Sequence, residues 1–181
     1  MIDEHERQEL RAIADYYIES SPFGKLLGID KDSVDLDNDT ITVTMRNDLI
    51  GNAFQGILHG GAISGMLDSM GGHLMFITGL KKTAGLPREE RIKKAPLVST
   101  IDLRIDYLRP GRGNVFTTTG AILRQGNKVA VTRMELHNEK GDLIAVGTGT
   151  YLVSPMPPNT SFDKVTLTEK PGDKTIHFDK Q

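Results

Sequence analysis

The sequence predicts an α+β protein, in which one antiparallel sheet of about five to six strands wraps around a single long helix. The helix is predicted at residues 60–79, where apolar side chains recur at spacings of three and four: Ile63, Leu67, Met70, Leu74 and Ile77. Four segments of alternating apolar and polar residues follow, and glycine-containing turns separate them. An apolar helix and a sheet with one apolar face can bury each other, so we expect the sheet to enclose the helix.

The chain before this helix is predicted to supply a covering helix and a hairpin. Residues 3–20 have an amphipathic helical pattern that Ser20, Ser21 and Pro22 bring to an end. Residues 26–46 change to a period of two around a turn with the sequence LDND, which indicates two strands. A loop at 47–58 then leads into the long helix.

The chain after the helix is predicted to form an exposed loop and a four-stranded meander. The loop, residues 81–96, is basic, contains two prolines and has room for one short helical turn. The strands are expected at 97–109, 114–124, 128–138 and 142–153, joined by the turn sequences RPGRG, RQGN and NEKGD.

The first strand of the meander shows which face it turns toward the helix. Its apolar residues alternate strictly, which predicts a helix-facing set: Ile101, Leu103, Ile105 and Tyr107. The opposite face is then polar and meets water or a partner subunit: Thr100, Asp102, Arg104 and Asp106. We therefore expect a homo-oligomer, either a dimer or a tetramer.

The length of 181 residues suits one domain with extensions. We divide the chain into a helical extension at 1–24, a main domain at 25–153 and a tail or hairpin at 154–181. The formal net charge of -2 gives no electrostatic case for nucleic-acid or membrane-surface binding. No apolar run approaches the roughly 18 residues of a membrane span, and the start lacks the apolar core of a signal peptide. A cytoplasmic location is the expectation.

Several classes of site are excluded by residue type and spacing. The chain has no cysteine, which excludes disulfides and thiolate chemistry. The histidines outside the glycine triplet show no metal-ligand spacing: His5, His73, His137 and His177. No phosphate-binding or dinucleotide glycine pattern is present. No metal, nucleotide or redox cofactor is therefore expected.

Asp68 is the first candidate for chemistry, because a carboxylate in an otherwise apolar helix is costly to bury unless it is paired or functional. An ionised carboxylate could attack a carbonyl carbon directly or activate water as a general base. The alternative is a structural carboxylate that accepts hydrogen bonds from its surroundings.

Gly60 and Gly61 stand where the long helix begins. Backbone N–H groups in the first turn of a helix have no acceptor within the helix, so they can stabilise a negatively charged oxygen. The alternative is that the glycines serve only a tight turn into the helix.

Three features together resemble the hotdog-fold acyl-CoA thioesterases, in particular the phenylacetate-pathway-like branch. They are the triplet His59-Gly60-Gly61, the acid nine residues after that histidine (Asp68), and the strand end Tyr107-Leu108-Arg109-Pro110-Gly111. The resemblance covers about residues 25–153. It implies an acyl-CoA substrate, paired sheets from two protomers and active sites at the dimer interface.

The resemblance also implies roles for the residues of the helix start. The Gly60 amide is the favoured donor to the thioester oxygen, with Gly61 beside it. His59 orients the loop or hydrogen-bonds near the thioester. Relatives often have an amide six residues before this histidine, where this chain has Ala53. Asn52 and Gln55 are therefore the candidate loop amides, with plain turn formation as their alternative.

The remaining candidates lie on the meander. The resemblance places the hydroxyl of Thr100, contributed by the other subunit, near the attacking water, with Ser99 in reserve; a threonine is also an ordinary strand residue. Arg109 and Arg112 correspond to positions near the phosphates of coenzyme A, although exposed arginines at turns are common.

The expected function is hydrolysis of an acyl-CoA-type thioester to a free acid and a thiol. Two alternatives remain open at this point: a binding module that senses or carries an acyl thioester without chemistry, and a dehydratase or hydratase of the same fold. The acyl chain is not predicted by the sequence.

Overall fold

The computed structural model describes residues 4–155, so the tail predicted at 154–181 lies almost wholly outside the described residues. Two helices come first, α1 (Glu4–Glu19) and α2 (Pro22–Leu27), followed by strands β1 (Val34–Asp35) and β2 (Thr40–Thr44). A short 3₁₀ turn, η1 (Asn47–Leu49), precedes the hairpin β3 (Ile50–Asn52) and β4 (Ile57–Leu58). Then come helices α3 (Gly60–Lys81) and α4 (Arg88–Lys94) and strands β5 (Pro96–Tyr107), β6 (Val115–Gln125), β7 (Val129–Asn138) and β8 (Leu143–Pro155).

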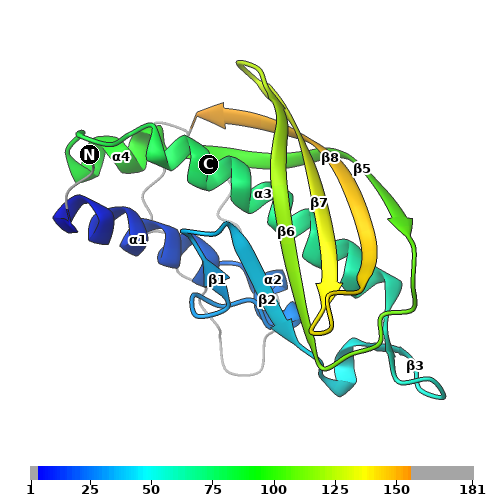
Figure 1. Ribbon diagram of the computed structural model, residues 1–181. Helices are drawn as coiled ribbons and strands as arrows, with labels where there is room; N and C mark the ends of the chain where they lie inside the picture. The colour runs from blue at the N-terminus through cyan, green and yellow to red at the C-terminus, as the bar shows by residue number, and fades with distance from the viewer. Residues whose placement is uncertain (1–3, 156–181) are drawn as a thin grey trace, which may run out of the picture.

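The predicted architecture is confirmed. Six strands form one antiparallel sheet in the order β1-β2-β6-β7-β8-β5. The sheet curls around α3, as Figure 1 shows. The helix is long and apolar because it lies inside this sheet, and most of its stripe is almost fully buried: Ile63, Met66, Leu67, Met70, Leu74, Met75 and Ile77.

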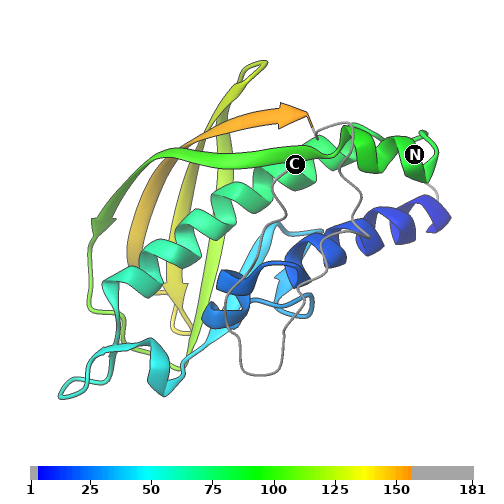
Figure 2. The same ribbon diagram turned by 180° about the vertical axis from the view of Figure 1, so that it is seen from behind.

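The N-terminal helices cover α3 on the side that the sheet leaves open (Figure 2). The ring of Tyr17 on α1 stacks on Phe76 of α3, with ring centroids 3.8 Å apart. Ser21, which was expected to end the first helix, also begins α2, because its hydroxyl accepts a hydrogen bond from the N–H of Gly24. The extension therefore packs against the same core as the sheet.

The segment predicted at 81–96 as an exposed loop with room for one short helical turn is mostly exposed and contains the seven-residue helix α4. Arg91 of α4 is only 4% exposed. Its guanidinium pairs with Glu6 of α1 at 2.7 Å and with Glu9 at 3.5 Å. The basic composition of this segment indicated solvent exposure, but one of its arginines is buried because α1 supplies carboxylates.

Strand β5 contains a β-bulge that the sequence analysis did not foresee. Thr100 pairs with Tyr151 and Asp102 pairs with Thr150, so Ile101 is an extra residue on β5. Ile101, predicted to face α3, is 57% exposed. A bulge reverses the alternation on its N-terminal side, which turns Thr100 toward α3 instead of away from it.

Candidate active site

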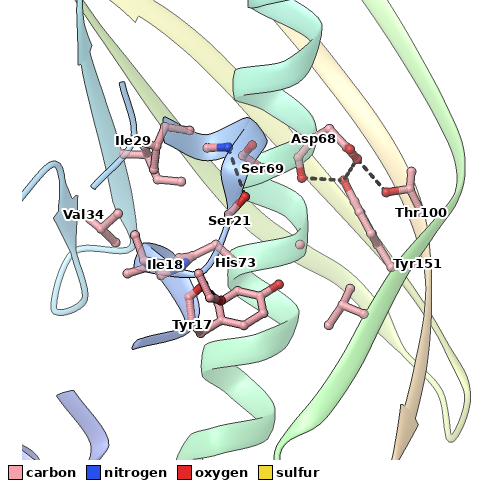
Figure 3. A pocket seen from close by; sticks show the side chains of 15 residues that line it. Tyr17, Ile18, Ser21, Ile29, Val34, Asp68, Ser69, His73, Thr100 and Tyr151 are labelled. Carbon is pink, nitrogen blue, oxygen red and sulfur yellow. Dashed lines mark hydrogen bonds between the residues drawn. The ribbon is translucent and has the colours of Figure 1, made fainter. Parts of the chain in front are cut away.

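The carboxylate of Asp68 is held by two hydroxyl groups from the sheet. The Thr100 hydroxyl donates a hydrogen bond to Asp68 Oδ1 at 2.9 Å, and the Tyr151 hydroxyl donates to the same oxygen at 3.2 Å. Figure 3 shows both side chains pointing at Asp68 from β5 and β8. Among the described residues, Oδ2 has no hydrogen-bond partner, so one oxygen is held while the other can act on a ligand.

Thr100 reaches Asp68 within one chain. The resemblance implied a hydroxyl contributed by the facing subunit, whereas this contact forms within one chain because the bulge at Ile101 turns Thr100 toward α3. Ser99, the reserve candidate, is the next residue on β5 and points to the other face of the sheet, where it pairs with the partly exposed Leu152.

Tyr151 is the residue of this site that the sequence analysis missed. It is 1% exposed, and its hydroxyl also lies 3.3 Å from the backbone oxygen of Asp68. Burial and the nearby Asp68 charge raise the pKa of Tyr151 well above its usual range, so the hydroxyl stays protonated as a donor.

Two glycines make room for the Tyr151 ring. A Cβ at Gly71 would lie 2.0 Å from the tyrosine hydroxyl, and one at Gly149 would lie 2.6 Å from it. Glycine in a helix interior is destabilising. Gly71, a glycine inside the apolar helix, was thus the available signal that a large side chain packs against this point of α3.

A cavity of about 370 Å³ lies beside Asp68, between α3, β5 and the N-terminal helices. The hydroxyl of Tyr17 is electrostatically coupled to this site, because burial and then the Asp68 charge raise the pKa of Tyr17. His73 also lines the cavity, and burial lowers its pKa to about 4, so it is neutral. The lining residues are Tyr17, Ile18, Ser20, Ser21, Gly24, Ile29, Val34, Ile41, Asp68, Ser69, Gly72, His73, Val98, Thr100 and Tyr151.

The start of α3 leaves one backbone donor unused. His59 caps the helix: its Nδ1 accepts a hydrogen bond from the Gly61 N–H at 2.8 Å. The Gly61 amide is therefore occupied. It does not offer the free donor to a substrate oxygen that the resemblance implied. The Gly60 N–H has no acceptor among the described residues. His59 thus orients the loop, and Gly60 is the donor that the helix start can offer.

The strand end that carried the family resemblance supports this helix start. The Tyr107 hydroxyl lies 3.1 Å from the Gly60 oxygen and 2.6 Å from Ser64 Oγ. Gly111 passes so close to Leu58 that a Cβ there would lie 2.8 Å from the leucine Cβ. Both contacts hold the loop that delivers the His59 cap.

The candidate loop amides are not brought to Asp68 within the chain. Asn52 Oδ1 accepts hydrogen bonds from the N–H groups of Phe54 and Gln55, at 3.1 and 3.2 Å. Gln55 Oε1 accepts from Arg112 at 3.3 Å. The Asn52 contacts form the turn of the β3–β4 hairpin, which projects from the molecule (Figure 1). The Gln55 side chain instead contacts the segment after β5.

The two arginines lie on the exposed segment after β5. Arg109 donates to the Leu143 oxygen at 2.8 Å, and Arg112 donates to the Gln55 oxygen at 3.3 Å. Neither arginine forms an ion pair with a carboxylate among the described residues, so each guanidinium keeps donors for an anion.

Gly60 and Asp68 are well separated within one chain. They are eight residues apart on α3, which is about 12 Å along the helix axis. An oxyanion donor and a general base must each lie within about 3 Å of the atoms they serve.

Residues 4–155 contain no candidate metal-binding cluster and no candidate membrane-spanning helix. No group of three or more His, Asp or Glu side chains there could hold a metal ion. No helix in that range is long and apolar enough to cross a membrane.

Comparisons with known proteins agree on one family. The thioesterase superfamily pattern matches residues 55–145. The medium/long-chain acyl-CoA thioesterase YigI of Salmonella typhimurium is 39% identical over 146 residues, which cover 81% of this chain and 94% of that protein. The Escherichia coli YigI is 38% identical over the same length. A Shewanella oneidensis crystal structure related to the thioesterase superfamily is 42% identical, with a TM-score of 0.69 over 84% of this chain and 99% of that one.

Proposed function

The chain belongs to the thioesterase superfamily and is a hotdog-fold acyl-CoA thioesterase, and we propose that it hydrolyses medium- and long-chain acyl-CoA with Asp68 as the general base. The observation that supports this role is that the two carboxylate oxygens differ in their hydrogen bonds. Thr100 and Tyr151 donate to Oδ1, and Oδ2 has no hydrogen-bond partner among the described residues. The chain-length class is taken from the YigI relatives. The phenylacetate-like branch stays a prediction.

In the proposed reaction, Asp68 Oδ2 accepts a proton from a water molecule whose oxygen forms a bond to the thioester carbon. Negative charge develops on the carbonyl oxygen, where the Gly60 N–H of a partner protomer stabilises it. The intermediate then collapses, the carbon–sulfur bond breaks, and coenzyme A leaves as a thiolate. Thr100 and Tyr151 keep the carboxylate oriented throughout.

The test of the base is Asp68→Asn, which keeps the shape of the side chain but cannot accept the proton. Loss of a general base typically costs a factor of about 10² to 10⁴ in rate. We expect thiol release from decanoyl-CoA to fall by that factor. An Asp68→Asn protein that releases thiol at the wild-type rate would show that Asp68 is not the general base.

The role of base can be separated from that of nucleophile. A single turnover in water labelled with oxygen-18 should put the label in the fatty acid and none in the peptide that contains Asp68. Label in Asp68 would show that the carboxylate attacks the thioester itself.

We further propose that the enzyme works as a two-fold symmetric dimer in which each Asp68 faces the Gly60 of its partner. The separation of about 12 Å along the helix axis within one chain supports this arrangement, because both groups must reach one carbonyl. Strand β5 lies at the edge of the sheet, and an unpaired edge strand is a template for pairing with a second copy. At least half of each of three apolar or aromatic side chains on this strand and directly after it is exposed to solvent: Ile101, Tyr107 and Leu108.

Mixed dimers test the shared site. Gly60→Pro removes the N–H donor at the first helical position, where proline is tolerated. Dimers that combine one Gly60→Pro protomer with one Asp68→Asn protomer should regain one intact site of two. If both groups serve one chain's own site, the mixed dimers should be as inactive as each parent.

Arg109 and Arg112 are proposed to contact the phosphates of coenzyme A. Both are exposed and lie on the segment that follows Tyr107, next to the start of α3. Replacing either by alanine should raise KM for acyl-CoA with little change in kcat, since phosphate contacts are equal in the ground and transition states.

A further inference from the structure

The cavity beside Asp68 extends away from the reacting groups into a part of the protein that the proposed chemistry does not use. Its floor is α3, where Asp68 and His73 are five residues apart, about 7 to 8 Å along the axis. The apolar part of its lining comes from the N-terminal region and the first strands: Ile18, Ile29, Val34 and Ile41. A cavity that joins the candidate catalytic carboxylate to an apolar wall can accommodate an acyl chain.

Gly72 lies on this floor between Asp68 and His73. A Cβ at Gly72 would meet no heavy atom within 4 Å, whereas one at the neighbouring Gly71 would collide with Tyr151. The space over Gly72 is thus open, and it lies inside the cavity. A helix gains stability when alanine replaces an interior glycine. Folding alone therefore gives no reason for a glycine at position 72.

The roof of the cavity comes from the N-terminal extension, which lies outside the matched thioesterase segment 55–145. Tyr17 is fixed there by its stacking on Phe76. The two serines of the roof are already bonded within the extension: Ser20 donates to the Tyr17 oxygen, and Ser21 accepts from Gly24. The roof is thus preformed, and its serine hydroxyls are hydrogen-bonded within the extension before any ligand binds.

We propose that the acyl chain of the substrate lies in this cavity, passes over Gly72 beneath the N-terminal extension, and is limited to medium length by the apolar wall. Gly72 is the specificity-determining residue, because any side chain there would occupy the path. The volume of about 370 Å³ is at the small end of ligand sites, which span about 300–1,000 Å³, and this favours medium over long chains. The proposal rests on the thioesterase function proposed above.

The test is the chain-length profile of Gly72→Leu. We would measure kcat/KM by thiol release for saturated acyl-CoAs from butanoyl to hexadecanoyl. Wild type should prefer octanoyl- or decanoyl-CoA to hexadecanoyl-CoA. Each buried methylene contributes a factor of about four, so a leucine that excludes two or more should lower the decanoyl-to-butanoyl ratio by at least about tenfold.

Two further variants control this experiment. Thr78→Leu adds the same side chain to α3 at a position outside the cavity, and its decanoyl-to-butanoyl ratio should match wild type. Gly72→Ala adds a single methyl group where nothing lies within 4 Å, so it should fold even if the leucine variant does not. Its ratio should shift in the same direction by a smaller factor.

The outcomes separate this inference from the proposed function. If wild type releases no thiol from any acyl-CoA, the function itself fails. If wild type hydrolyses acyl-CoA but both Gly72 variants keep the wild-type profile, or lose all chain lengths equally, the acyl chain does not pass over Gly72. A wild-type preference for hexadecanoyl-CoA would overturn the assignment to medium chains.

Discussion

The neighbouring glycines 71 and 72 of α3 should respond in opposite ways to the same substitution. Gly72→Ala gains helix propensity and meets open space, so it should raise the free energy of unfolding by about 1 kcal/mol. Gly71→Ala gains the same propensity, but its methyl group would lie 2.0 Å from the Tyr151 hydroxyl and 2.5 Å from Cζ. Carbon atoms require about 3.5 Å, so the tyrosine ring must move by more than 1 Å.

The size of the difference follows from these contacts. Overpacking a core typically costs about 1–3 kcal/mol, and the displaced Tyr151 hydroxyl loses hydrogen bonds to Asp68 worth about 1 kcal/mol each. After the gain in helix propensity, Gly71→Ala should be about 2 kcal/mol less stable than wild type. The two variants should therefore differ by about 3 kcal/mol, or about 6–12 °C in Tm for a domain of this size.

Urea unfolding followed by circular dichroism would measure both variants against wild type. The slope of the transition should not change, so that the midpoints report stability directly. Gly71→Ala should also release thiol more slowly, because Tyr151 no longer holds Asp68. If Gly71→Ala is as stable as Gly72→Ala, the packing of Tyr151 against α3 is not as described.

Three other predictions concern single side chains. Tyr151→Phe keeps the ring but removes one of two hydroxyl donors to Asp68, the proposed general base, so kcat/KM should fall by about 10- to 100-fold; unchanged thiol release would contradict its positioning role. Glu6→Gln leaves the buried Arg91 with a weaker partner and should cost about 3 kcal/mol in urea unfolding, whereas Glu90→Gln, in an exposed pair, should change stability by less than about 1 kcal/mol. His73 has a folded-state pKa of about 4 against 6.5 when unfolded, so the unfolded chain binds the proton first as pH falls. The free energy of unfolding should fall by about 3 kcal/mol from this group between pH 6.5 and 4, and His73→Leu should lack that part of the pH dependence.

The sequence alone predicted most of the fold, because its periodicities are local. The apolar stripe of residues 60–79 and the four alternating segments needed no knowledge of distant contacts, and both are present as α3 and β5–β8. Two local signals failed. The alternation in β5 did not reveal the bulge at Ile101, since a bulge depends on the partner strand β8. The basic segment before β5 did not reveal a buried arginine, since its carboxylate partners lie more than 80 residues earlier.

The candidate site shows the same division. Asp68 was identified from the sequence because a charge within an apolar stripe is anomalous wherever the helix lies, and Gly60 because a helix start always leaves backbone donors unpaired. Only the tertiary structure decided the rest. It assigned the Gly61 amide to His59, turned Thr100 toward Asp68 through the bulge, and brought Tyr151 from the last strand to the middle of α3. Those outcomes depend on strand register and on close packing between distant segments. Neither strand register nor packing between distant segments produces a periodic pattern in the amino-acid sequence.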